Sequence, residues 1–594
     1  MSELKTINIP PGITTLKSDR ETGPRWTAGD MVRFRNGLAQ KLGGWQRGDG
    51  TFVGKCRALF DWRSNSQAKY IALGTNKKLY IWSGGNIYDI TPIRTSGTLG
   101  LNPFSMTDTS AVVAVTHNTH GNSAGDYVHY SGATAAGGIT IDGEYTVTAV
   151  TNANEYTITH SAAATSTTTG GGAAVAYQYE IHVGAEDSLY GTGYGTGGYG
   201  LSTYGTPRTT TTILFSARTW SLDNWGEDLI ANPRGGGIYV WDSSVGTGTR
   251  ATAMSGAPST ALFTMTFNEN RHVMAFGAHD GAADDPLNTR WCTSEDYTDW
   301  TPAETNTAGD KRLDSGNELI CAVKAKGESV VYSNFFMWSM VFTGPPDQFT
   351  FKPIGTNGGI LGPNAVVEMD GAVYWLGYQD FYVYDGAVRV IPCEVHNHVF
   401  DDFNFVQKAK VHAHVNRLFG EIWWFYCSAG SAEIDKYVIL NVRENLWSIG
   451  SLVRTAAVGD SDLFDVPYAA GADGYLYDHD TGTDNDVAAA ITAYLESGGI
   501  EIVDGEAMML IDRFVPDFET LTGSVDVTFK AKRYPQSSET ISDTTLNITS
   551  ATELARPRVK GRQMSVRIES NDLLDHWRFG GALRIGVKPY GKRL

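Results

Sequence analysis

The chain has 594 residues, of which 41% are apolar, so it is long enough for several compact cores and too apolar to be disordered. Its formal net charge of −18 excludes a nucleic-acid-binding protein that works through a broadly basic surface. The cysteines at positions 56, 292, 321, 393 and 427 have no C-x-x-C spacing and predict free thiols. No signal-peptide core is present at the start and the longest apolar run, residues 335–342, is short, so we expect no membrane-spanning segment.

The composition predicts an all-β fold. Glycine occurs 67 times and aromatic residues make up 11% of the chain, which favours many short strands joined by tight turns. Alternating aromatic strands across Gly, Asn or Asp turns return at intervals of about 30 to 60 residues, the range of β-propeller blades. We therefore predict a β-propeller core, with a stack of β-sandwiches as the alternative.

Residues 1–97 are predicted to form an N-terminal segment and the first blade. Between Arg94 and Arg208 there is no Lys or Arg, while eight acidic residues occur, and this break in composition marks an insertion. Its Thr/Val-rich strands predict a small inserted β-domain over residues 98–182. Residues 183–212 alternate Gly with Tyr and Thr without an apolar period, which predicts a low-complexity loop.

Residues 213–496 are predicted to form the remaining blades, and residues 497–594 a β-sandwich-like platform. That platform could pair with the N-terminal strand segment 30–45, which would bring both basic chain ends together. From Arg556 to Leu594 there are 10 basic residues and three acidic ones, a local net charge of +7. A solvated basic edge and a docking face for an acidic partner both fit this charge. For the second interpretation, we expect charge reversal at Arg584, Lys588 and Arg593 to weaken assembly in a salt-dependent way.

Three segments are candidates for chemistry. His396 with His398 and His412 with His414 form two H-x-H pairs that would suit zinc if they met on adjacent strands, although structural histidines are the simpler interpretation. Asp478 to Asp486 is rich in carboxylates, as in a calcium loop, but it lacks the bidentate Glu of an EF-hand, and we favour a solvated acidic hairpin tip.

Ser294 to Trp300, SEDYTDW, resembles the Asp-box turn of sialidase-type propellers without its glycine, and predicts a turn outside any active site. The sequence contains no nucleophile elbow, H-E-x-x-H helix, P-loop or dinucleotide fingerprint, and no spacing nominates an opposed pair of carboxylates. We therefore predict a protein that is not an enzyme, with no catalytic, cofactor-binding or metal-binding residues and no cofactor.

Three segments together carry a family resemblance. They are residues 57–92 (RALFDWRSNSQAKYIALGTNKKLYIWSGGNIYDITP), residues 218–242 (RTWSLDNWGEDLIANPRGGGIYVWD), and residues 561–570 with 577–593 near the C-terminus. The chain resembles the tail nozzle proteins of short-tailed phages, also called tail stabilisation or tail tubular proteins. The matches touch the beginning, middle and end of the chain, so the resemblance extends to the protein as a whole.

This resemblance implies a structural subunit of the virion tail, made in the host cytoplasm, that forms a homo-hexameric ring. The implied partners are the head-tail adaptor ring above and tail fibres or spikes. Double-stranded DNA would pass through transiently without specific binding, which suits an acidic chain because an acidic lumen repels phosphate. The alternatives are a carbohydrate-binding or carbohydrate-cleaving β-propeller tail protein, and a bacterial propeller that serves as a protein scaffold.

Overall fold

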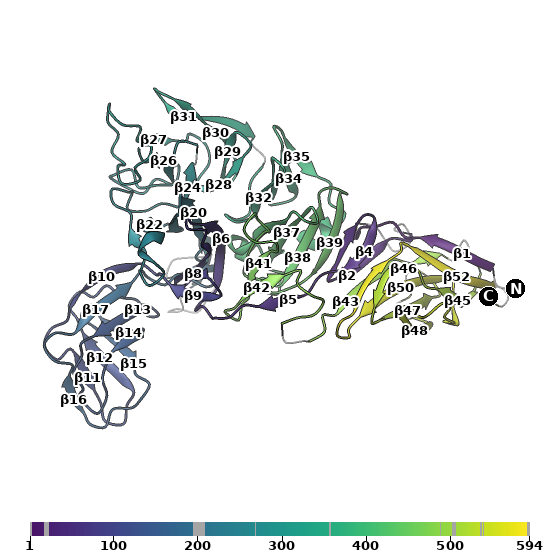
Figure 1. The fold of residues 1–594 in the computed structure, drawn as a ribbon, viewed down its shortest axis with the longest axis horizontal. Coiled ribbons are helices and arrows are strands. Elements are labelled where there is room, and N and C mark those ends of the chain that lie inside the picture. The colour runs from purple at the N-terminus through teal and green to yellow at the C-terminus, as the bar shows by residue number, and fades with distance from the viewer. Residues whose placement is uncertain are drawn as a thin grey trace. The chain divides into compact units, whose positions relative to one another are not determined.

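The computed structural model describes residues 3–16, 23–193, 208–267, 269–355, 358–486, 489–501, 507–534, 537 and 540–590. Strands make up 51% of the chain and helices 3%, which confirms the all-β class. The chain divides into two compact units (Figure 1). The middle unit is Gly50–Asp314, and the terminal unit combines Met1–Asp49 with Ser315–Leu594.

The middle unit contains three four-stranded antiparallel sheets with the meander order of propeller blades. The first is β6 (Cys56–Arg63), β7 (Lys69–Thr75), β8 (Leu79–Ser83) and β9 (Asn86–Asp89); the second is β20 (Trp220–Trp225), β21 (Asp228–Pro233), β22 (Tyr239–Trp241) and β23 (Thr252–Ala253); the third is β24 (Phe263–Phe267), β25 (His272–Phe276), β26 (Asn288–Trp291) and β27 (Gly309–Arg312). A short 3-10 helix, η1 (Ser243–Val245), follows β22. The first strands of these three sheets lie side by side, since β20 contacts both β6 and β24.

One glycine allows the first two blades to approach closely. Trp220 is buried and donates a hydrogen bond from its indole to the Thr75 carbonyl at 2.7 Å. A Cβ atom on Gly74 would lie 2.5 Å from the Trp220 ring, well inside van der Waals contact. Any larger residue at position 74 would therefore push the two blades apart.

The insertion is an eight-stranded sheet that follows the first blade. Its strands, in sheet order, are β10 (Ile93–Thr98), β17 (Ala176–Glu180), β13 (Tyr127–Ser131), β14 (Gly143–Asn152), β15 (Glu155–Thr159), β12 (Val112–Thr116), β11 (Phe104–Met106) and β16 (Thr168–Gly170). The first half of β14 pairs with β13 and the second half with β15, so this strand joins two layers. They enclose a separate core that includes Phe104, Tyr130 and Tyr156.

The terminal unit holds four more four-stranded blades. They are β28 (Leu319–Ala325), β29 (Glu328–Ser333), β30 (Met337–Gly344) and β31 (Gln348–Gly355); β32 (Val366–Met369), β33 (Ala372–Leu376), β34 (Phe381–Tyr384) and β35 (Val388–Ile391); β36 (His412–Asn416), β37 (Glu421–Tyr426), β38 (Lys436–Asn441) and β39 (Leu446–Ser451); and β40 (Ala456–Val458), β41 (Tyr468–Ala470), β42 (Leu476–His479) and β5 (Trp45–Arg47). The last blade takes its outer strand from the N-terminal segment, because β5 pairs with β42.

The rest of the terminal unit is a platform built from both chain ends. The first sheet has the strand order β1 (Glu3–Asn8), β52 (Ala582–Pro589), β45 (Met509–Val515), β49 (Val559–Gly561). The second sheet has the order β2 (Trp26–Asp30), β43 (Ala493–Ser497), β50 (Gln563–Ser570), β47 (Ser524–Lys532), β48 (Ser542–Thr549), and β44 (Ile500–Glu501) also pairs with β50. The third sheet has the order β3 (Val32–Arg35), β4 (Leu38–Lys41), β51 (His576–Phe579), β46 (Phe518–Thr522). Every sheet of the platform thus contains N-terminal and C-terminal strands.

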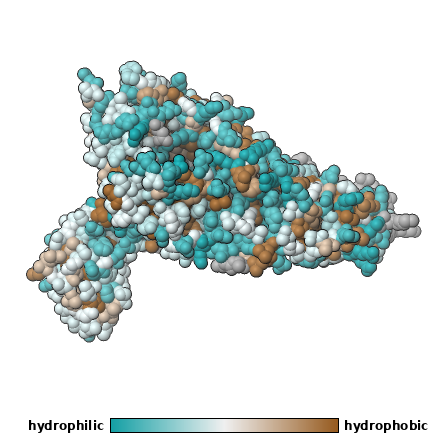
Figure 2. Space-filling view, in the orientation of Figure 1, coloured by the Kyte–Doolittle hydropathy of each residue, from teal (hydrophilic) through white to brown (hydrophobic). Residues whose placement is uncertain are grey.

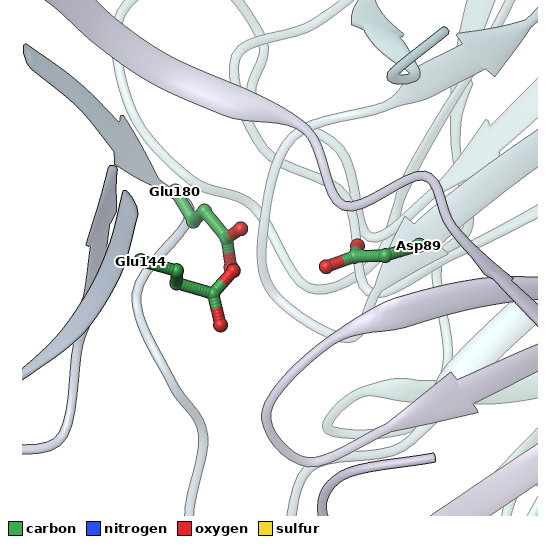
Figure 3. Close-up of side chains that lie close together, drawn as sticks. All are labelled: Asp89, Glu144 and Glu180. Carbon is green, nitrogen blue, oxygen red and sulfur yellow. The ribbon is translucent and has the colours of Figure 1, made fainter. Parts of the chain in front are cut away.

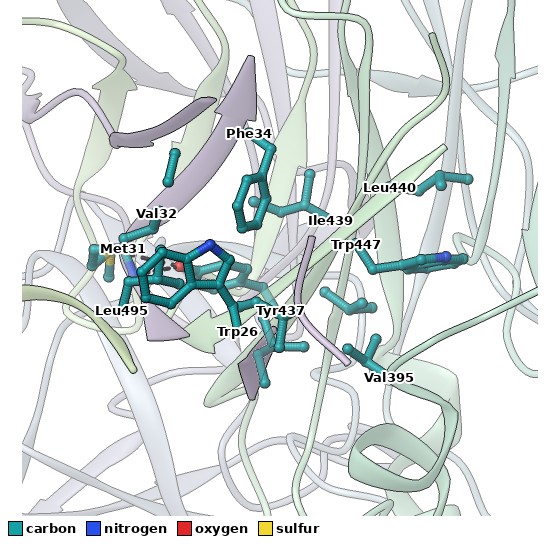
Figure 4. Packing of buried hydrophobic residues seen from close by; sticks show 14 of the residues in the cluster. Trp26, Met31, Val32, Phe34, Val395, Tyr437, Ile439, Leu440, Trp447 and Leu495 are labelled. Atoms are coloured by element: carbon teal, nitrogen blue, oxygen red, sulfur yellow. Dashed lines mark hydrogen bonds between the residues drawn. The ribbon is translucent and has the colours of Figure 1, made fainter. Parts of the chain in front are cut away.

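The N-terminal strands are embedded in the blade formed by β36 to β39 (Figure 4). The Tyr437 hydroxyl accepts a hydrogen bond from the Met31 amide at 3.0 Å, and the Asn441 side chain donates one to the Phe34 carbonyl at 3.1 Å. Trp26 and Trp447 are both buried in the same cluster. This core ties the platform to the blades of its own unit.

The structure differs from the sequence prediction at the Gly/Tyr-rich segment. Residues 183–212 were expected to be a loop, but β18 (Leu189–Gly193) and β19 (Arg208–Phe215) pair as an antiparallel ladder, with Leu189 opposite Phe215. Residues 194–207 of this segment lie outside the described residues. The run RTTTTILF at residues 208–215 is rich in β-branched residues, which suit a strand, and the glycine content of the rest of the segment hid this pattern.

Large exposed hydrophobic side chains are scattered through the chain, among them Leu101, Phe215 and Phe335. The face shown in Figure 2 accordingly has small hydrophobic patches separated by hydrophilic ones. In the part of the chain that is described, no helix is long and apolar enough to cross a membrane.

Removing the insertion should leave the blades folded. Gly97 and Tyr177 are cross-strand partners, so a two-residue Asn-Gly turn can join them when residues 98–176 are deleted. We expect the deletion variant to keep the protection from hydrogen exchange of β7 and β21, because the insertion has its own core. A variant that is insoluble, or that has lost protection in these strands, would show that the insertion is integral to the unit.

Candidate functional site

The two H-x-H pairs do not converge on adjacent strands. His396 begins the helix α2 (His396–Phe400) and lies with its Nε2 2.6 Å from the Gln379 carbonyl. His412 and His414 lie on one face of β36, where both rings stack on Phe425 at centroid distances of 4.9 and 5.8 Å. These histidines pack as structural residues. The first pair was expected on a strand but lies on the helix α2, which a short connection joins to η2 (Phe405–Lys410).

The acidic segment 478–486 is not a solvated hairpin tip. Asp480 forms an ion pair with Arg33 at 2.9 Å, and its carboxylate also accepts hydrogen bonds from the Asn416 side chain and the Gly43 amide. The Asp484 carboxylate accepts from the Leu574 amide at 3.0 Å. The carboxylates therefore face inward and hold the two chain ends, which corrects the sequence interpretation.

The Asp-box-like segment forms a turn between β26 and β27. The Asp296 carboxylate accepts a hydrogen bond from the Thr298 amide at 2.8 Å, and the buried Trp300 donates its indole N–H to the Tyr297 carbonyl at 2.7 Å. Both side chains stabilise the turn itself.

Three carboxylates meet where the insertion joins the first blade (Figure 3). Asp89 comes from the end of β9, and Glu144 and Glu180 come from β14 and β17 of the insertion. Oxygen atoms of all three lie within 4.8 Å of one another, and this is the one group of potential metal ligands found among the described residues.

Lys78 occupies the centre of this carboxylate cluster. Its Nζ lies 2.8 Å from Asp89, 2.6 Å from Glu144 and 3.3 Å from Glu180, and the side chain is almost fully buried. Arg250 contacts Asp89 at 2.7 Å and Glu180 at 2.9 Å. The ammonium group thus takes the position that a divalent cation would need, and the cluster works as a clamp between blade and insertion.

Burial and the nearby cations have opposite effects on the pKa values of the carboxylates in this clamp. Burial raises the pKa of Glu180 to about 7, although Lys78 and Arg250 lower it in part. For Asp89 the two cations outweigh burial, and its pKa is lowered. The clamp therefore depends on the Lys78 ammonium to offset the desolvation of the carboxylates.

Replacing Lys78 with Met should destabilise the middle unit by about 3 kcal/mol, because buried carboxylates lose their main counter-charge. The vacated position should then accept calcium, so millimolar Ca²⁺ should raise the melting temperature of Lys78→Met and leave the wild type unchanged. The variant Lys78→Met/Glu144→Gln is the control and should lose the calcium response. Calcium stabilisation of the wild type would contradict the clamp.

The clamp was not predicted from the sequence, although one signal for it was present. The insertion contains no Lys or Arg between Arg94 and Arg208. A buried carboxylate in a segment without Lys or Arg has few cationic partners nearby in the sequence, so a partner from another part of the chain is favoured. Lys78 of the first blade and Arg250, which lies between β22 and β23 of the second blade, supply that charge.

A second buried charge cluster lies in the terminal unit. Arg33 is fully buried and pairs with Glu421 at 3.1 Å as well as with Asp480. Burial raises the pKa of Glu421 to about 6, and the nearby Arg33 only partly lowers it. The cluster joins the N-terminal strand β3 to the blade strand β37.

Glu421 should make stability fall as pH rises. A carboxyl whose folded pKa lies above its ordinary value of 4.5 binds its proton more tightly when folded, so its contribution is complete below about pH 4.5 and is lost through about pH 6. We expect the wild type to lose about 2 kcal/mol relative to Glu421→Gln across this window. Parallel urea denaturation at pH 4.5 and 6.5 measures the difference, and equal losses in both proteins would contradict the expectation.

The outer face of the platform's first sheet is basic. Leu583, Ile585 and Val587 of β52 point into the core, so the alternate positions Arg584 and Lys588 point outward. Arg584 is exposed, whereas Lys588 lies 3.3 Å from the Asp512 carboxylate. Arg593, the third residue in the predicted basic set, lies outside the described residues.

A groove of about 550 Å³ crosses this face. Its lining residues form what we call the terminal groove: Leu510, Asp512, Arg513, Arg556, Arg558, Lys560, Lys588 and Tyr590. Five cations and one carboxylate give the groove a net charge of +4 in a chain of net charge −18. This surface is therefore suited to an anionic ligand or partner.

No family model matches the chain, and no curated protein matches it. Among solved structures it is similar to the phage phi92 endosialidase, with 9% identity and a TM-score of 0.17, over 72% of this chain and 64% of that one. It is also similar to a GH74 enzyme of Niastella koreensis, with 12% identity and a TM-score of 0.29, over 71% and 67% of the two chains. The AfRom2 CNH domain matches with 12% identity and a TM-score of 0.27, over 59% and 93%. At these TM-scores the similarities do not indicate a function.

Proposed function

We propose that the chain is a structural subunit of a phage tail, a nozzle protein that forms a six-fold ring below the portal and adaptor. The observation that supports this most is the platform, in which both chain ends share every sheet and present a basic face. A subunit that stacks under another ring needs a rigid end of this kind for docking. The blades then serve as the wall of a conduit, and no bond is broken.

The charge distribution agrees with a conduit for DNA. The net charge of −18 disfavours adhesion of a passing duplex, because sliding requires that phosphates are not captured along the way. The basic residues gather instead at the platform, where they can attract an acidic protein surface. In this proposal the adaptor ring contacts the platform and tail fibres or spikes contact the blades or the insertion.

Charge reversal on the platform tests the docking role. We expect Arg584→Glu/Lys588→Glu to lower the fraction of particles with complete tails, with a defect relative to wild type that becomes smaller at higher salt, because salt screens the interactions of exposed interface charges. Folding should change by less than about 1 kcal/mol. Arg63→Glu/Lys326→Glu, at two exposed positions on the blades and with the same change in charge, is the matched control. Complete tails at wild-type frequency in the double variant would argue against the docking role.

Immunogold labelling of purified particles tests the location. Antibodies against the insertion should label the short tail, at a position below the neck. Label on the capsid only, or a purified monomer or trimer that binds glycans on an array, would favour the carbohydrate-binding alternative instead.

A further inference from the structure

We propose that the terminal groove binds an acidic segment of a partner protein, one in which Asp or Glu residues alternate with an apolar residue. This deepens the proposed function, and it rests on that function only for the identity of the partner. Three adjacent strands, one carboxylate in the floor and two arginines at the rim give the groove its charge pattern.

The strands place two ammonium groups on either side of an apolar side chain. Leu510 of β45 lies opposite Lys560 of β49 on one side and opposite Lys588 of β52 on the other. Strands in a sheet are about 4.8 Å apart, so the two lysines stand about 10 Å apart across the half-buried Leu510. In an extended segment, residues i and i+2 face the same way, so two acidic residues separated by an apolar one can both face these lysines while the apolar side chain points away from the sheet.

The floor carboxylate orients the cations. A register irregularity in β45 between Ile511 and Arg513 brings both Asp512 and Arg513 into the groove. Asp512 lies 3.3 Å from Lys588 and 3.7 Å from Arg513, so one carboxylate holds two cations in position. A negative group in the floor disfavours a continuous phosphate backbone, which would bring charge to every part of the groove.

The rim of the groove carries positive charge that is not paired with a carboxylate in the described part of the chain. Arg556 and Arg558 are both exposed, and no ion pair of either is found in the described part of the chain. The planar guanidinium of arginine binds carboxylates with two parallel hydrogen bonds. These two residues are therefore available to a partner without breaking an existing contact.

The aromatic residue in the groove is partly covered. Lys560 donates a hydrogen bond to the Tyr590 hydroxyl at 2.9 Å, and its Nζ also lies 4.1 Å from the centre of that ring. One face of Tyr590 is thus occupied by a cation, which leaves less ring for base stacking of the kind that single-stranded nucleic acids use. This again favours a peptide over a nucleic acid.

The test measures binding of a fluorescein-labelled peptide of alternating Glu and Leu to the full-length chain. We expect saturable binding that weakens as salt is raised, and a loss of about tenfold or more in affinity for Arg556→Glu/Arg558→Glu. Arg63→Glu/Lys326→Glu removes the same charge from exposed positions on blades and should change affinity less than about twofold, which separates the groove from general electrostatics.

A 12-base-pair duplex is the competing probe. The inference is overturned if the duplex binds the groove more tightly than the peptide, or if the two double variants bind the peptide equally. Equal melting temperatures of wild type and variants exclude loss of fold as the cause, and Arg556→Gln/Arg558→Gln repeats the test without added negative charge. None of these outcomes depends on the symmetry of the assembled tail, so failure here leaves the proposed function standing.

Discussion

Replacing Trp26 with Ala should destabilise the terminal unit by about 3 to 5 kcal/mol, the usual cost of removing a large buried aromatic side chain. Trp26 is 1% exposed and packs edge-to-face on Phe579 at 5.8 Å. It lies on β2, which pairs with β43, so its loss opens the core between the two chain ends (Figure 4).

Hydrogen exchange read out by mass spectrometry should locate this loss. Protection should fall in β2, β43 and β51 and stay unchanged in the middle unit, because the two units have separate cores. Trp26→Phe keeps an aromatic ring, so the terminal unit should lose less than half as much free energy of unfolding as in Trp26→Ala. Trp220→Ala changes a similarly buried residue of the middle unit, so it should lower protection in that unit and leave protection in the terminal unit unchanged. A uniform loss of protection in either variant would show that the two units unfold as one.

Replacing Arg33 with Met should cost about 3 to 5 kcal/mol, because Glu421 would remain as a buried charge without its cation. Glu421 is 1% exposed and cannot be hydrated in place, whereas Asp480 is partly accessible. The second change Glu421→Gln should therefore recover part of the loss, because it removes the carboxylate that has lost its cation.

A double-mutant cycle of Arg33→Met and Glu421→Gln in urea measures this coupling. We expect a coupling free energy of about 1 to 3 kcal/mol. Additive effects would mean that the two groups do not interact, and that the pair at 3.1 Å contributes nothing to joining β3 to the blade.

Local sequence patterns were sufficient to predict the strands. Residues 70–73 and 79–82 are short apolar runs that flank a polar turn, and the structure has β7 and β8 there, because a hairpin depends on neighbours in the chain. The all-β class follows from many such units. The helix at His396 was missed because the spacing of its two histidines is compatible with a strand as well as with a turn of helix.

Long-range electrostatic partners could not be predicted in the same way. The acidic segment 478–486 was recognised by composition, but Asp480 finds Arg33 at a separation of 447 residues. A pairing between residues so far apart leaves no periodic pattern in the sequence. An acidic loop also has the same composition whether it faces water or a buried arginine. The basic excess near the C-terminus was visible as charge, while the groove required the register of β49, β45 and β52.

Cryo-electron microscopy of the native particle tests the central proposal most directly. We predict six copies of this chain in one ring of the short tail, with the platform strands β1 and β52 toward the adaptor and the axial channel wide enough for duplex DNA. Any other symmetry for this chain in the tail, or its absence from the tail, would contradict the proposed nozzle.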